Sequence, residues 1–146
     1  MGEKGPGQVM LSEHPYLSLS IRKLTNTIKR NGTNYKPGDI VIAKISFSEA
    51  NSGNAKVRPV LVISTESHNK NRNDLVVLKI SSKSISDARW EIVIRDAKQT
   101  GLKIPSKIVC DGVKTVCKED VRFIGRLDRL TLKKVKKNLE NLLFGD

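Results

Sequence analysis

Arg58 and Pro59 stand directly before a run of apolar, mostly β-branched residues, Val60 to Ile63. Because apolar residues do not alternate with polar ones in this run, we predict a strand that is buried on both faces. Pro59 cannot donate to a sheet ladder, so we expect it at the first residue of the strand, on an edge or at a bulge. Arg58 is then held at the mouth of a rigid element, where its planar guanidinium can meet a phosphate. An ordinary surface arginine before a core strand is the alternative interpretation.

Other kinds of site have little support in the residues. The sequence has no Gly-rich phosphate loop, no HExxH pair and no Cys/His cluster, so we expect neither a metal nor a cofactor. Its only histidines are His14, near the N-terminus, and His68, in a polar segment directly after the Arg58 strand. Only His68 is placed to approach the same mouth. Cys110 and Cys117 are too few for a disulfide scaffold, and we predict small core or half-buried residues.

Turn residues divide the chain into short apolar runs, which predict five or six strands and a C-terminal helix. Residues 46–56 form a loop of 11 residues, longer than a hairpin needs, so we predict a functional flap there. A helix capped near Thr131 and stopped by Gly145 ends the chain. This pattern favours a mainly β (α+β) fold, a small antiparallel barrel with helical additions. The predicted strands span residues 40–45, 60–63, 75–80, 90–95, 107–116 with a bend at Gly112, and 123–127.

The first 35 residues differ in character from the barrel domain predicted for residues 36–146. Residues 1–11 hold three glycines and a proline, which predicts a mobile tail. Residues 15–30 carry one apolar helical stripe with basic residues beside it. We expect this added basic helix to pack on the domain. A basic arm for RNA, a partner-docking element and a membrane-surface element are the alternatives.

The charge of the chain favours a polyanionic partner. Lys and Arg number 27 against 15 acidic residues, a net charge of +12. Nucleic acid is the commonest partner of such a protein, an anionic membrane surface is the rival, and a merely solvated basic face is the bland alternative. No apolar run approaches the roughly 20 residues that span a bilayer, and the N-terminus lacks a secretory signal. We therefore expect a cytoplasmic protein without a membrane partner.

The order of motifs resembles the MazF/PemK family of toxin endoribonucleases. Pro37–Val41, a loop and then Lys56–Ser64 resemble the opening of that family. The resemblance covers about residues 36 to 143 and leaves the N-terminal helix outside. The later pieces match in order: Leu75–Ser82, the "G-L-x-x-x-S" of Gly101–Ser106, Val113–Val116, and the "I-G-x-L" of Ile124–Leu127.

The resemblance implies an SH3-like barrel, usually a homodimer, that cuts single-stranded RNA without a metal. It also implies a cognate antitoxin whose segment occupies the RNA groove. Carried over by position, the catalytic arginine of the family falls on Arg58 and its catalytic hydroxyl, commonly threonine, falls on Ser81. The swap to serine keeps the O–H and loses a methyl. Ser82 takes this place if the register is off by one.

The chemistry of RNA cleavage fits these residue types. Attack by the neighbouring 2′-OH passes through a dianionic phosphorane, which needs donors fixed where charge develops. Arg58 and Ser81 supply such donors, and Lys56 and Lys83 flank them, where they can hold the RNA backbone. Arginine is a poor proton acceptor, although the resemblance assigns acid–base work to Arg58. Other possible helpers are His68, Asp39 and Glu66.

A non-catalytic nucleic-acid-binding protein on the same fold is the alternative function. SH3-like barrels host many functions, so the fold alone does not exclude it. The serine at position 81 and the unassigned general base keep this alternative open. Salt-dependent binding of RNA without cleavage would favour it.

Overall fold

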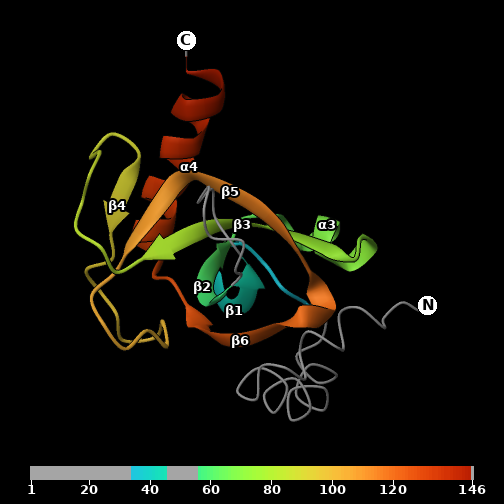
Figure 1. Cartoon of the computed structure of the whole chain (residues 1–146). Helices are drawn as coiled ribbons and strands as arrows, with labels where there is room; N and C mark the ends of the chain where they lie inside the picture. The colour runs from blue at the N-terminus through green and yellow to red at the C-terminus, as the bar shows by residue number, and fades with distance from the viewer. Residues whose placement is uncertain (1–33, 46–55, 146) are drawn as a thin grey trace.

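A six-stranded antiparallel sheet with a C-terminal helix dominates the fold (Figure 1). The computed structural model describes residues 34–45 and 56–145. The strand order is β4-β5-β3-β2-β1-β6, and each neighbouring pair is antiparallel. The elements are β1 Asp39–Ile45, β2 Lys56–Val62, α3 Glu66–Asn71, β3 Asp74–Ser81, β4 Glu91–Val93, β5 Lys107–Cys117, η2 Lys118–Asp120, β6 Val121–Arg126 and α4 Arg129–Phe144.

The prediction of a mainly β antiparallel fold is confirmed, but the sheet is not closed. Strands β4 and β6 each pair with a single neighbour, so both are edges. In Figure 1 the strands curl around a core, with β5 arching over β1 and β2. The expected N-terminal helix and all but the last residue of the expected flap lie outside the described residues.

Both faces of the central strands are buried, as the unbroken apolar runs predict. One face of β1, β2 and β3 contributes Val41, Val60 and Val77 to a core inside the curved sheet. The other face contributes Ile40, Leu61 and Leu78 to a second core, which Val135 of α4 helps to cover. Strands flanked by two cores need no polar face, because neither face meets water.

Several elements differ in detail from the predictions. Helix α4 is capped near Thr131, as predicted, but the cap residue is Asp128, whose Oδ2 accepts the Thr131 N–H at 2.9 Å. A short helix, α3, replaces the expected polar loop, with Thr65 as its cap. The strand predicted at 90–95 is only three residues long. For the two helices a polar cap decides where the helix begins, and hydrophobic periodicity does not register such contacts.

Strand β5 bends where Gly112 predicts it. Leu78 of β3 pairs with Val113, whereas the next residue, Lys79, pairs with Val109. The intervening residues of β5 form a bulge, and a Cβ on Gly112 would lie 3.0 Å from the Lys79 Cβ. Cys110 is buried and Cys117 is half-buried, both as free thiols, which confirms their predicted roles. No helix in the described part of the chain is long and apolar enough to cross a membrane.

Candidate active site

Pro59 lies where β2 loses its β3 neighbour. The N–H of Ile63 donates to the Val76 carbonyl of β3 at 2.9 Å, so Pro59, four residues earlier, also directs its nitrogen toward β3. The ladder between the two strands ends at Val60 and Lys79, one residue short of Pro59. A proline here therefore costs no hydrogen bond. Pro59 is not the first residue of β2, which begins three residues earlier, at Lys56, and β2 lies inside the sheet; only the end of the β3 ladder leaves Pro59 without a partner on that side.

The parting of β2 from β3 brings Arg58 level with Ser81. If the register of Val60 with Lys79 is carried two residues further, Arg58 stands opposite Ser81. Both residues line an open pocket of about 640 Å³. The Arg58 Nε is buried and has no hydrogen-bond acceptor among the described residues. This guanidinium therefore carries an N–H that no described residue accepts, beside a pocket that Arg58 lines.

The Ser81 hydroxyl is oriented by the chain that follows it. Its Oγ accepts the backbone N–H of Lys83 at 3.1 Å. Because this contact uses an oxygen lone pair, the O–H proton remains free to donate. Ser82 and Lys83 also line the pocket. The structure thus gathers Arg58, Ser81, Ser82 and Lys83 in one place.

A loop between β4 and β5 forms the opposite wall of the pocket. It rests on β6 through the Arg126 N–H, which donates to the Gln99 carbonyl at 2.7 Å. Gly101 has a φ of +77°, and a Cβ there would lie 2.2 Å from the Ile124 carbonyl oxygen. A Cβ on Gly125 would lie 2.3 Å from the Gln99 oxygen. Gly101 of the "G-L-x-x-x-S" motif and Gly125 of the "I-G-x-L" motif therefore allow the backbone of the loop to pack directly against the backbone of β6.

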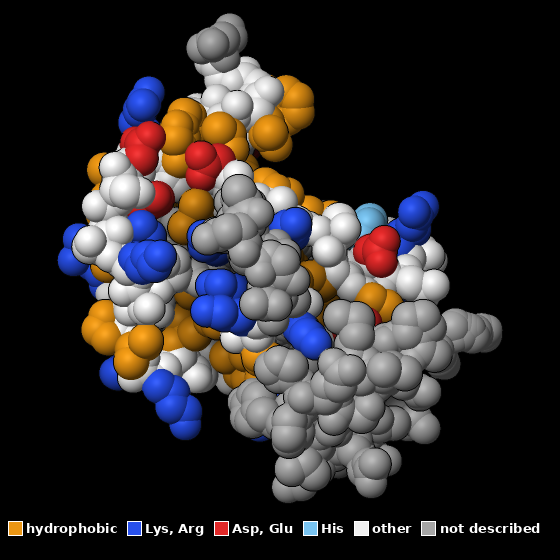
Figure 2. Space-filling model, viewed as in Figure 1, with side chains coloured by type: hydrophobic (Ala, Val, Ile, Leu, Met, Phe, Trp, Pro, Cys, Tyr) orange, Lys and Arg blue, Asp and Glu red, His pale blue; other side chains and the backbone are white. Residues whose placement is uncertain are grey.

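This wall adds pocket residues that the sequence did not single out. Lys103 comes from the loop, and Arg122 and Phe123 come from β6. With Arg58 and Lys83, the described lining holds four cationic side chains and no acidic one. Figure 2 shows several Lys and Arg side chains clustered on the face viewed there. The position of Lys103 inside the "G-L-x-x-x-S" motif is the one signal that pointed to it.

Four other predicted residues do not line the pocket. Lys56 begins β2 and is exposed. His68 lies in α3, beyond the far end of β2, and Val62 at that end is already about 13 Å from Arg58. The His68 Nδ1 lies 3.0 Å from the Asn69 Oδ1. Asp39 and Glu66 lie at the same far end.

Asp39 has a structural partner. Its carboxylate lies 3.2 Å from the Arg126 Nε and accepts the Lys36 N–H at 3.0 Å. Burial raises the pKa of this carboxyl, although the Lys36 N–H and the Arg126 charge both lower it. In the described part of the chain, no three His, Cys, Asp or Glu side chains gather where they would hold a metal ion.

The open antiparallel sheet, the C-terminal helix and the cationic pocket define a small β domain that can hold an anion. The chain matches the family model described as PemK-like, MazF-like toxin of type II toxin-antitoxin system over residues 36–143, and it belongs to that family. Among curated proteins, no sequence is similar enough to count as a match.

Solved structures share the fold. The Mycobacterium tuberculosis toxin MazF-mt6 is 27% identical, with a TM-score of 0.57 over 70% of this chain and 93% of that one. An endoribonuclease in complex with its cognate antitoxin, from a mycobacterial species, is 14% identical, with a TM-score of 0.60 over 75% and 94%. The MazE–MazF complex of Deinococcus radiodurans is 16% identical, with a TM-score of 0.60 over 75% and 96%.

Proposed function

We propose that this protein is the toxin of a type II pair and acts as an endoribonuclease that cleaves single-stranded RNA without a metal. The observation that carries this proposal is the placement of Arg58 and Ser81 in one cationic pocket. Family membership and the solved endoribonucleases of the same fold support it.

Arg58 and Ser81 act as paired donors in the proposed reaction. The 2′-oxygen of the RNA bonds to phosphorus and the 5′-oxygen leaves, so negative charge develops on the non-bridging oxygens. The Arg58 guanidinium and the free Ser81 O–H would bond those oxygens. No carboxylate or imidazole of the described residues lines the pocket. The 2′-OH proton therefore passes to a water molecule and the leaving 5′-oxygen takes its proton from another, while Arg58 acts only as a donor.

The shape of the pocket favours an unpaired strand. Beside its cations it offers apolar surface, against which an unstacked base can lie. A base in a duplex stays stacked and does not reach such a pocket. The apolar lining comes from Ile42, Leu102, Ile104, Phe123 and Ile124, among others.

We extend the proposal to the domain organisation, the protein partner and the oligomeric state. We assign residues 36–146 to one SH3-like barrel domain, to which residues 1–35 add a basic helix. One solved relative is an endoribonuclease in complex with its cognate antitoxin, which supports a cognate antitoxin as partner here. We expect a homodimer that acts on RNA in the cytoplasm.

The test is cleavage of a long single-stranded RNA in EDTA, with cut sites mapped by primer extension. Arg58→Ala is expected to fold and to lose cleavage, because the pocket loses its fixed donor. Arg95→Ala, an exposed arginine outside the pocket lining, is the matched control and should retain activity. Full activity in Arg58→Ala would contradict the site. Salt-dependent binding by the wild type without any cleavage would favour a non-catalytic RNA-binding protein.

A further inference from the structure

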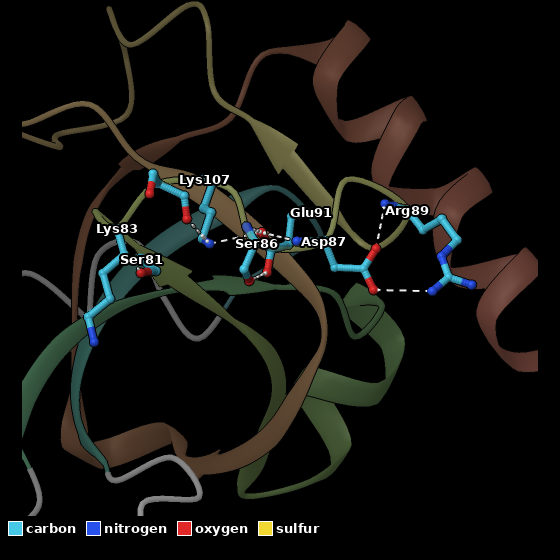
Figure 3. A network of polar contacts seen from close by, with 8 residues as sticks. Ser81, Lys83, Ser86, Asp87, Arg89, Glu91 and Lys107 are labelled. Carbon is cyan, nitrogen blue, oxygen red and sulfur yellow. Dashed lines mark hydrogen bonds and ion pairs between the residues drawn. The ribbon is translucent and has the colours of Figure 1, made fainter.

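A buried ion pair lies beside the pocket, on the strand next to Ser81 (Figure 3). Lys107 of β5 pairs with Ser81 of β3 across the ladder. Its Nζ lies 2.8 Å from the Glu91 Oε1, and the two side chains are only 7% and 9% exposed. The same Nζ donates to the Ser84 carbonyl at 2.7 Å. Lys107 therefore joins β5, β4 and the segment that leaves β3.

Glu91 holds the same segment from the other side. Its Oε1 accepts the N–H groups of Ser86 and Asp87 at 2.7 and 3.2 Å, and its Oε2 accepts the Ser86 hydroxyl at 2.9 Å. Burial raises the pKa of Glu91, but these donors and Lys107 lower it further, to about 2. The carboxylate thus stays ionised at any working pH, and the network stays intact.

The residues that Lys107 and Glu91 bond directly follow residues that line the pocket. Lys107 bonds Ser84 and Glu91 bonds Ser86 and Asp87, and Ser82 and Lys83 precede these residues. The Lys83 N–H is the donor that orients the Ser81 hydroxyl. In Figure 3 the Lys83 side chain points away from Lys107, so the link between them runs through the backbone.

We propose that Lys107 and Glu91 are positioning residues: they fix the segment after β3 and so hold the Ser81 hydroxyl in its donating orientation. This inference rests on the proposed function, because it assigns the ion pair to the same reaction. A buried ion pair adds little net stability compared with apolar residues of the same volume, but its geometry is specific. A specific geometry of this kind can hold a hydroxyl in the orientation needed to donate to the oxygen on which negative charge develops.

The test is a double-mutant cycle on cleavage. Lys107→Met keeps the apolar stem and removes the charge. It is expected to lower kcat about 10- to 100-fold while KM for RNA changes less than about threefold. In a Ser81→Ala background the same substitution should cost little more, because its effect passes through Ser81. An equal loss in both backgrounds would overturn the proposal, since it is what general destabilisation produces.

Arg126→Met is the matched control. It breaks a second ion pair with a buried carboxylate, between Arg126 and Asp39, and neither residue lines the pocket. Any loss of kcat that Arg126→Met causes should be the same with serine or with alanine at position 81. If Lys107→Met does not fold, Glu91→Gln carries the same test, because glutamine keeps the shape and one acceptor oxygen.

A second measurement separates this inference from the proposed function. Backbone order parameters of residues 82–87 should fall from about 0.85 to below about 0.6 in Lys107→Met without RNA. Unchanged order at Lys83 would overturn the positioning role, whatever the activity. Absence of cleavage by the wild type would instead overturn the proposed function.

Discussion

Arg58 and Ser81 offer their donors in different ways. The guanidinium is fixed by its half-buried place in β2, and its Nε has no acceptor among the described residues. The hydroxyl rotates freely in principle, and the Lys83 N–H restricts it by occupying its oxygen. Removal of either donor should therefore act on the transition state more than on RNA binding.

Substitution of Ser81 tests the hydroxyl itself. Ser81→Ala should lower kcat about 10²- to 10³-fold, the usual cost of one donor to a developing oxyanion. Ser81→Thr should retain most of the activity, because the O–H remains. Steady-state cleavage of a short RNA measures both. If Ser81→Ala stays fully active while Ser82→Ala does not, the catalytic hydroxyl belongs to Ser82.

The strands that are buried on both faces were predicted from the sequence, because burial requires unbroken apolar runs. The apolar runs at β1, β2 and β3 are covered by two cores, and each was expected as a strand. The start of β2 was missed, because Lys56 to Arg58 are held by pairing with β1 and carry no strand pattern. Helix α3 was missed because six polar residues give no apolar stripe, and its Thr65 cap marks only its start.

The contact of the β4–β5 loop with β6 depends on Gly125. The Cβ of Gly125→Ala would lie 2.3 Å from the Gln99 carbonyl oxygen, so the loop or the strand must shift. We expect a loss of about 1 to 3 kcal/mol in the free energy of unfolding, the usual cost of overpacking. Urea unfolding measures it, with the exposed Lys98→Ala as a control within about 0.5 kcal/mol of the wild type. An unchanged free energy of unfolding in Gly125→Ala would show that the loop can shift away from β6 without cost.

The pocket belongs to the whole molecule, which limits what the sequence revealed of it. Arg58 and Ser81 were named through the order of family motifs. Helpers were chosen by nearness along the chain, and this placed His68 and Lys56 at the site, although neither lines the pocket. Lys103 and Arg122 were missed, because the fold carries them to Arg58 from distant segments, and register and backbone contacts decide such neighbours.

The cations of the pocket should appear in the salt dependence of RNA binding. Each phosphate neutralised on a single strand adds about −0.7 to the slope of log K against log salt. Measured in the Ser81→Ala background, Lys103→Ala should therefore make the slope shallower by about 0.7, and Lys98→Ala should leave it unchanged. Equal slopes in all three proteins would mean that charges elsewhere on this +12 chain hold the RNA. The pocket would then serve cleavage without contributing to capture.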